Sequence, residues 1–266
     1  DMDLNLKDKT VIVTGAASNI GKGIALAFAA EGARVAIADI DHDRAKGVAE
    51  ECLANGAADA IAVRTDIADW DNVQATVAEV EKTLGPVDIL VNNAGWVVDR
   101  LFTEKPREEW EREIQINLWG MINCTRAVLD GMIARRSGAV VSIASDAGRI
   151  GEYREGVYGA CKAGIISLSK TLARENGRFN LRFNVVCPGT TPPPADEEVS
   201  EHSLWSSDEM KAWLAEDMRQ RIAKAYPLRR IGQPQDIAPA VLFLASEKAS
   251  FITGQTISVS GGYSMV

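Results

Sequence analysis

The stretch Thr10-Val-Ile-Val-Thr14-Gly15-Ala-Ala-Ser18-Asn19-Ile20-Gly21 decides the fold. A β-branched run leads into a glycine turn, and the turn leads directly into a helical pattern over residues 20–31. Glycine lets the backbone turn tightly and approach a pyrophosphate, which the positive end of the following helix attracts. The spacing differs from Gly-x-Gly-x-x-Gly, so a plain strand-to-helix turn with packing glycines is the alternative. Asn19 stands where a third glycine is expected, and asparagine tolerates a positive φ.

Short β-branched runs alternate with helical patterns along the rest of the chain. The pattern predicts strands at 10–14, 34–39, 60–64, 87–91, 139–143, 182–186 and 256–259, and helices at 20–31, 44–54, 70–84 and 108–135. Apolar strands joined by helical crossovers favour a parallel sheet that is covered on both faces. We therefore expect an α/β fold, in which residues 1–266 form a single Rossmann-type domain with a doubly wound sheet of about seven strands.

The segment from about residue 190 to 233 breaks this alternation. It begins with Pro192-Pro193-Pro194, continues with several acids, and contains Trp205, Trp213 and a helical pattern at 206–224. A long excursion beside the carboxyl edge of a sheet is more often a lid or a binding loop than a passive connection. The sequence therefore predicts a substrate lid here.

Composition excludes several classes of protein. The chain of 266 residues has a net charge of −8, which disfavours nucleic acid as a partner. No apolar run reaches the length of a membrane span and no signal-peptide pattern is present, so we expect no membrane partner and a cytoplasmic location. Four cysteines without a Cys-x-x-Cys pair indicate reduced thiols, and two histidines are too few for a His-rich metal site, so no metal is expected.

The stretch Tyr158-Gly-Ala-Cys-Lys162 carries the chemistry. Residues four apart share one face of a helix, so the phenol and the ammonium point the same way. We expect the cation to lower the phenol pKa and to make Tyr158 a general acid and base. The motif is weak alone, and Ser145 and the glycine turn strengthen it.

An acidic residue at the end of the second predicted strand indicates the cofactor. Asp39 can accept both hydroxyls of an adenosine ribose and would repel a 2′-phosphate, which favours NAD over NADP. Asp66 and the adjacent Ile67 end the third strand and could contact the adenine, although Asp66 could equally be a helix N-cap.

These residues resemble the short-chain dehydrogenase/reductase family over nearly the whole chain. The resemblance includes the glycine turn, Asn92-Asn93-Ala94-Gly95, Asn117, Ser145, Tyr158, Lys162, Pro188-Gly189 and the closing Thr253-Gly254-Gln255 and Gly261-Gly262. It implies that Tyr158 exchanges a proton with the substrate oxygen, that Ser145 holds this oxygen, and that Lys162 binds the nicotinamide ribose. It also implies that Asn117 holds a water of a proton relay. It further implies a homodimer or homotetramer.

The resemblance implies NAD as the cofactor, held by Gly15, Ser18, Asn19, Ile20, Gly21, Asp39, Asp66, Ile67, Asn93, Ala94, Gly95, Tyr158, Lys162, Pro188, Gly189 and Thr191. The chain departs from the family pattern at three places. Asn19 replaces a glycine of the turn, and Cys161 stands where serine is commoner. Thr191 is the best substitute for the threonine that usually follows Pro-Gly at a greater distance.

The substrate is expected to be a secondary alcohol or its ketone. Candidate pocket residues are Trp96, Val97, Asp146, Ala147, residues 151–155 with Tyr153, and Trp205, although both tryptophans could simply pack the lid. A finer resemblance to dehydrogenases of 2-hydroxycyclohexanecarboxyl-CoA favours oxidation of a cyclic or aryl-bearing alcohol, with or without a CoA thioester. The alternatives are a 3-oxoacyl (ACP or CoA) reductase, against which Asp39 counts, and a non-catalytic nucleotide-binding protein.

Overall fold

The computed structural model describes residues 3–194, 197, 200–206, 208–211 and 215–266. Seven parallel strands form one sheet in the order β3-β2-β1-β4-β5-β6-β7. The strands are β1 (Thr10–Thr14), β2 (Arg34–Asp39), β3 (Asp59–Arg64), β4 (Ile89–Asn92), β5 (Gly138–Ile143), β6 (Leu181–Pro188) and β7 (Thr256–Val259). All seven strands predicted from the sequence form, and the expected α/β, doubly wound Rossmann-type sheet is confirmed.

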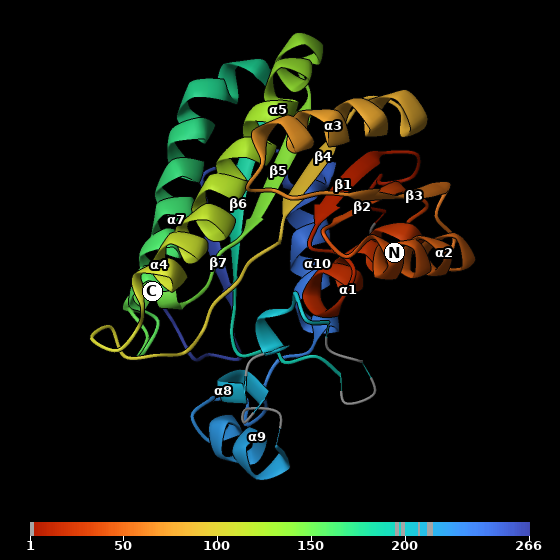
Figure 1. Cartoon of the computed structure of the whole chain (residues 1–266). Coiled ribbons are helices and arrows are strands. Elements are labelled where there is room, and N and C mark those ends of the chain that lie inside the picture. Colours follow the sequence, from red (N-terminus) through yellow and green to blue (C-terminus); the bar gives the residue numbers. More distant parts are fainter. Residues whose placement is uncertain (1–2, 195–196, 198–199, 207, 212–214) are drawn as a thin grey trace.

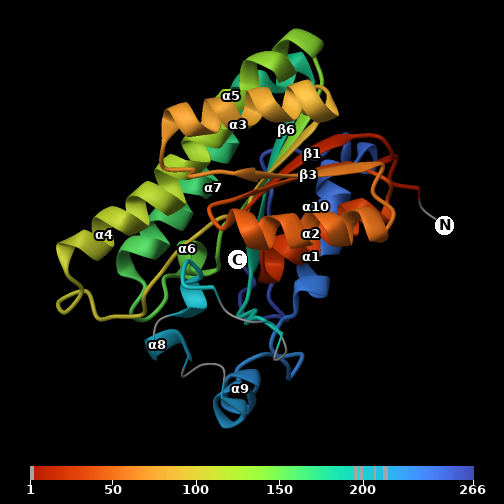
Figure 2. The same cartoon turned by 45° about the vertical axis from the view of Figure 1, so that its right-hand side comes forward.

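Helices cover both faces of the sheet, as Figures 1 and 2 show. One face is covered by α1 (Asn19–Ala30), α2 (His42–Ala54) and α10 (Pro234–Ala245), and the other by α3 (Trp70–Leu84), α5 (Gly120–Arg135) and α7 (Gly156–Asn176). Each face has its own apolar cluster, with Phe28 fully buried in the first and Phe183 in the second. Strands that are buried on both faces explain why the strand sequences are apolar throughout.

The predicted helix at 108–135 is not a uniform α-helix. It consists of α4 (Arg107–Glu113), a π-helical stretch (Ile114–Trp119) and α5. The Asn117 amide Nδ2 donates to the carbonyl of Glu113 at 2.9 Å and to that of Trp96 at 2.7 Å. A side chain that bonds to backbone inside a helix competes with the regular i→i−4 pattern, and π-helical turns of this kind gather at functional sites.

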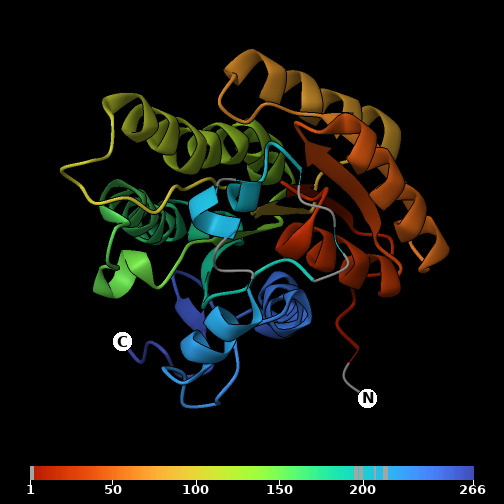
Figure 3. The same ribbon diagram turned by 60° about the horizontal axis from the view of Figure 1, so that its bottom comes forward.

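The chain order reverses between β1 and β4, which lie side by side although β2, β3 and their helices separate them in sequence. Ligands of open α/β sheets bind at such a switch point, outside the carboxyl ends of the strands. The described part of the 190–233 segment lies beyond these ends and carries α8 (Asp208–Lys211) and α9 (Glu216–Ala223), as Figures 1 and 3 show. The predicted helix at 206–224 is therefore two helices, and residues 207 and 212–214 lie outside the described part.

The short α6 (Ala147–Ile150) precedes α7 and stands close to it. Short 3₁₀ turns occupy Gly177–Phe179, Leu204–Ser206 and Glu247–Ala249. Within the described residues, no helix has both the length and the apolar character needed to cross a bilayer.

Candidate active site

A cleft of about 530 Å³ runs along the carboxyl edge of the sheet. The glycine turn and Asp39 lie along the same cleft as Ser145, Tyr158 and Lys162, and Trp205 of the 190–233 segment lines it too. The parallel strands explain this convergence, because their carboxyl ends all meet at one edge of the sheet. The cleft is the candidate active site.

The glycine turn is shaped by close backbone approach. Gly15 has a φ of 61°, and a Cβ there would stand 2.7 Å from the Cα of Ala94. A Cβ on Gly21 would stand 2.1 Å from the carbonyl oxygen of Gly15. Asn19 has a φ of 44°, a left-handed conformation that asparagine tolerates. Both positions therefore require glycine, because a Cβ would clash with neighbouring backbone. Gly15 and Gly21 also line the cleft, so the backbone of the turn is accessible to a ligand.

The residues of this turn fit a dinucleotide. The N-terminus of α1 points into the cleft, where its partial positive charge attracts an anion. The Oδ1 atom of Asn19 is buried and has no hydrogen-bond partner among the described residues. That oxygen requires a donor, whereas the backbone amides of the glycine cradle suit the acceptor oxygens of a phosphate-bearing ligand.

Asp39 ends β2 and lines the cleft beside the turn. Its Oδ2 accepts a hydrogen bond from the Ala17 amide at 2.9 Å, and its Oδ1 accepts one from the Asp41 amide at 2.9 Å. Burial raises the pKa of this carboxyl above its ordinary value, and the two amides oppose the rise. Two fixed oxygens with spare lone pairs suit the two hydroxyls of a ribose.

Asp66 is not the N-cap of α3. That position belongs to Asp69, whose side chain accepts a hydrogen bond from the Asn72 amide at 3.0 Å. The Oδ1 of Asp66 instead accepts from the Ala68 amide at 3.0 Å, and Asp66 and Ile67 both line the cleft. The helix-cap alternative for Asp66 is therefore wrong.

Ser145, Tyr158 and Lys162 come together in the cleft. The hydroxyl of Ser145 lies close enough to the phenol of Tyr158 to lower its pKa. Lys162 is 3% exposed, its Nζ donates to the Ile143 carbonyl at 3.0 Å, and this atom lies 5.4 Å from the centre of the Tyr158 ring. Ser145 follows β5, and Tyr158 and Lys162 lie on one face of α7, so two elements fix the three groups.

The expected effect of Lys162 on the tyrosine pKa is corrected by the structure. Burial raises the pKa of Tyr158 above its ordinary value, and Glu155 adds to the rise. Burial also lowers the pKa of Lys162 to about 8. Desolvation disfavours the charged form of either group, and here it outweighs their mutual attraction.

Asn117 holds the loop after β4 in place. Its Oδ1 accepts a hydrogen bond from the Trp96 amide at 3.2 Å, while its Nδ2 donates to the Trp96 carbonyl. A Cβ on Gly95 would stand 3.0 Å from the Asn117 Oδ1 and 3.3 Å from the Lys162 Nζ. Glycine at 95 thus lets the loop approach both side chains, and the Asn117 amide is engaged with backbone.

The loop after β6 closes the other side of the cleft. Pro188 and Gly189 line it, and the Thr191 hydroxyl donates to the Gly189 carbonyl at 3.0 Å. The Thr191 carbonyl accepts from the Asn19 Nδ2 at 3.0 Å. Thr191 therefore lies against the glycine turn. The cofactor-binding residues predicted from the sequence that line the cleft are Gly15, Ser18, Asn19, Ile20, Gly21, Asp39, Asp66, Ile67, Asn93, Ala94, Gly95, Tyr158, Lys162, Pro188, Gly189 and Thr191.

The predicted pocket residues divide into two groups. Trp96 and Trp205 are buried, and both line the cleft, as do Asp146 and Ala147. Tyr153 does not line it and is 74% exposed, which corrects its assignment to the pocket. It belongs to the turn before α7, where its amide donates to the Glu152 carboxylate and its ring extends into solvent.

The sequence analysis missed Asp99, Arg112, Met210, Tyr226 and Tyr263, which line the cleft. Asp99 lies four residues after Gly95 in the loop after β4. Its position after the carboxyl end of a strand could have indicated that it lines the cleft. Tyr226 and Tyr263 are stacked with ring centres 5.1 Å apart. They lie outside every motif, and no pattern in the chain points to them.

Fold and cleft together define a dinucleotide-binding oxidoreductase of the Rossmann type, with a serine, a tyrosine and a lysine at the reacting end. Residues 15–264 match the family model described as enoyl-(acyl carrier protein) reductase. The chain belongs to the short-chain dehydrogenase/reductase family, whose members depend on a pyridine nucleotide.

Similar proteins agree with this assignment. The chain is 38% identical to 3-oxoacyl-[acyl-carrier-protein] reductase FabG of Staphylococcus epidermidis, over 97% of this chain and 100% of that protein. It is 35% identical to the enzyme of the same name from Thermotoga maritima, over 97% and 99% of the two chains. A short-chain type dehydrogenase/reductase from Mycobacterium marinum has a similar structure, with a TM-score of 0.87, 29% identity, and coverage of 99% of this chain and 98% of that one.

Proposed function

We propose that the protein is a 3-oxoacyl thioester reductase that interconverts 3-oxoacyl and 3-hydroxyacyl thioesters and uses NAD(H). The full-length similarity to 3-oxoacyl-[acyl-carrier-protein] reductases carries this proposal. These relatives favour the reductase over the oxidation of a cyclic or aryl-bearing alcohol, which the sequence analysis ranked first. The buried Trp96 and Trp205 in the cleft keep the cyclic alcohol as the second candidate.

The catalytic groups have distinct roles in this proposal. Ser145 holds the carbonyl oxygen of the substrate, and Tyr158 donates a proton to that oxygen during reduction. Lys162 carries positive charge beside the phenol, and its lowered pKa lets it pass a proton back to Tyr158 after each turnover. A bound nicotinamide supplies the hydride, and the protein supplies position and a proton donor. Asn117 keeps Trp96 and Gly95 in place beside Lys162.

Two carboxylates support NAD(H) over NADP(H). Asp39 and Asp41 line the cleft at the end of β2, and Arg44 lines it nearby. The Asp41 side chain accepts from the Arg44 amide at 3.2 Å and from the Ser200 hydroxyl at 2.9 Å. A 2′-phosphate beside Asp39 would meet like charge, whereas ribose hydroxyls would donate to it.

The lid is part of the proposal. Trp205 and Met210 of the 190–233 segment are buried and line the cleft that Tyr158 also lines, which supports a lid role for this segment. We further propose that residues 1–266 act as one domain and associate into a dimer or tetramer. The exposed Ile114 and Trp119 of the π-helical stretch before α5 are consistent with such a contact.

Steady-state rates with acetoacetyl-CoA and either NADH or NADPH test the function, alongside oxidation of a cyclic secondary alcohol by NAD⁺. The proposal requires reduction of the thioester, with a higher kcat/KM for NADH. Tyr158→Phe should lower kcat by about 10²–10⁴ while NADH still binds. Tyr153→Phe, at an exposed site, is the matched control. Turnover of the cyclic alcohol alone would favour the second candidate, and activity unaffected by Tyr158→Phe would remove Tyr158 from the mechanism.

A further inference from the structure

Three carboxyl groups outside the catalytic set line the substrate end of the cleft. Asp99 belongs to the loop after β4, and Glu152 and Glu155 belong to the turn before α7. Glu155 is the residue just before α7, three positions before Tyr158, and both residues line the cleft. The catalytic mechanism proposed above uses none of these three groups.

These carboxyls are held in fixed positions. The Tyr263 hydroxyl donates to the Glu152 Oε2 at 2.6 Å, and the carboxyls of Glu155 and Asp99 lie close enough to shift each other's pKa. Asp99 is 6% exposed, and its Oδ1 has no hydrogen-bond partner among the described residues. Burial and the neighbouring Asp99 raise the pKa of Glu155 to about 8, and burial raises the pKa of Asp99 above its ordinary value.

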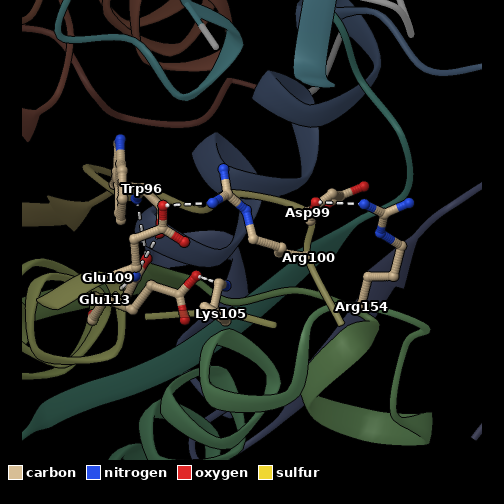
Figure 4. Close-up of polar contacts among 8 residues, drawn as sticks. Trp96, Asp99, Arg100, Lys105, Glu109, Glu113 and Arg154 are labelled. Atoms are coloured by element: carbon tan, nitrogen blue, oxygen red, sulfur yellow. Dashed lines mark hydrogen bonds and ion pairs between the residues drawn. The ribbon is translucent and has the colours of Figure 1, made fainter. Parts of the chain in front are cut away.

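The nearby cations already have partners, as Figure 4 shows for two of them. Lys105 forms a buried ion pair with Glu113, and the Arg154 guanidinium donates to the Asp99 carbonyl at 3.0 Å. Arg112 lies on the Trp96 ring, 4.1 Å from its centre, and is exposed. Arg112 therefore places positive charge on the Trp96 ring, while Asp99, Glu152 and Glu155 add carboxyl groups to the cleft that Tyr158 also lines.

Negative charge inside a pocket repels an anionic ligand more strongly than the same charge does in water. A free carboxylate beside the reacting carbonyl, as in a 3-oxo acid, would enter this acidic space. A thioester or ester of the same acid is neutral there. Any phosphate of a carrier arm lies far from the carbonyl, where Arg112 at the exposed face could accept it.

We propose that Asp99, Glu152 and Glu155 form a carboxyl filter that excludes free 3-oxo and 3-hydroxy acids and admits only their neutral esters and thioesters. This inference rests on the proposed function for the thioester, and it deepens that function by assigning residues to substrate selection. It also implies that a thioester-forming reaction supplies the substrate, because the free acid is rejected.

Acetoacetate and methyl acetoacetate test the filter, because they differ in the charge next to the ketone. With NADH at pH 7, we expect kcat/KM to be about a hundredfold higher for the ester. Asp99→Asn and Glu152→Gln should each reduce this ratio about tenfold, mainly through faster use of the acid. Glu104→Gln, at an exposed position of the same loop, should leave the ratio unchanged.

A kcat/KM for acetoacetate within threefold of that for methyl acetoacetate would overturn the filter. A ratio of the two kcat/KM values that stays unchanged in both Asp99→Asn and Glu152→Gln would also overturn it. If Asp99→Asn does not fold, Glu152→Gln decides the outcome. Reduction of the ester but not of acetoacetyl-CoA, with the ratio intact, would reject the proposed function and keep the filter. If neither small ketone turns over, fluorescence titration of the protein–NADH complex gives the same ratio as affinities. Equal affinity for acid and ester would then overturn the filter.

Discussion

The carboxylate of Glu197 accepts a hydrogen bond from the backbone amide of Asn19, with 2.7 Å between Oε1 and N. Asn19 is the first residue of α1, so the carboxylate occupies the positive end of that helix. The pyrophosphate of a dinucleotide is expected at the same amide. An anion of the 190–233 segment thus stands where an anion of the cofactor belongs, and the two compete.

Glu197→Gln is therefore expected to tighten NADH binding. A carboxylate at a helix N-terminus contributes about 0.3–1 kcal/mol, so its removal should lower the Kd about two- to fivefold. Titration of NADH fluorescence measures this Kd. Glu201→Gln is the control, because Glu201 is exposed and pairs with His202 instead. Weaker NADH binding in Glu197→Gln would mean that Glu197 supports the cofactor rather than competing with it.

Asp39→Ser is expected to weaken the preference for NADH over NADPH. The hydroxyl can still accept one of the two amide hydrogen bonds, while the charge that opposes a 2′-phosphate is lost. The ratio of kcat/KM values for NADH and NADPH should fall at least about tenfold. Asp43→Asn, whose side chain is 93% exposed on α2, should not change it. A ratio that stays constant in Asp39→Ser would show that other groups select the cofactor.

Lys162→Met is expected to stabilise the cofactor-free protein at pH 7 while it abolishes activity. Burial lowers the folded-state pKa of Lys162 from 10.5 to about 8, so the folded state binds fewer protons than the unfolded state between these values. The resulting penalty is fully present below about pH 8 and disappears as the pH rises toward 10.5. Methionine removes this penalty but also loses the hydrogen bond to the Ile143 carbonyl. The net result should be an increase of about 2 kcal/mol in the free energy of unfolding at neutral pH.

Urea unfolding of the wild type and Lys162→Met at pH 7 and near pH 10 checks this prediction. The stability difference should shrink at the higher pH, because the wild-type lysine is then neutral in both states. Lys170→Met, on the exposed face of the same helix, is the control for the loss of a charge. A variant less stable than the wild type at pH 7 would contradict the argument.

Asn19→Ala is expected to destabilise the protein by about 1 kcal/mol relative to Asn19→Gly. Both changes remove the hydrogen bond from the Asn19 side-chain Nδ2 to the Thr191 carbonyl. The difference in stability between the two variants therefore measures the energetic cost of holding a residue with a Cβ at a φ of 44°. Chemical denaturation of the two variants measures this difference. Equal stability would show that the turn relaxes to a negative φ when the side chain is small.

The regular elements were predictable because their signals are local. The β-branched runs, the helical periods and the glycine turn each lie within a few residues, and all seven strands form near the predicted positions. The π-helical interruption was not predictable from the helical period. It accompanies the bonds of Asn117 to Trp96, which lies 21 residues away along the chain.

The pKa values of the catalytic groups were also not predictable from local sequence patterns. The spacing of Tyr158 and Lys162 suggests that a cation lowers the phenol pKa, yet burial raises it. Spacing reveals which groups are neighbours, whereas burial depends on everything packed around them. Asp99 and Glu155 are likewise 56 residues apart, and only the fold places their carboxyls in contact.

The sequence by itself determined the family, the parallel sheet and the identity of the groups at the reacting end. These depend on local spacing and on the rule that parallel strands place their carboxyl ends at one edge. Only the tertiary structure decided that Glu197 reaches the amide of Asn19, that Tyr153 faces solvent, and that carboxyls surround the substrate end. These relationships join distant segments, and electrostatics in the cleft depends on burial, which no short stretch of sequence encodes.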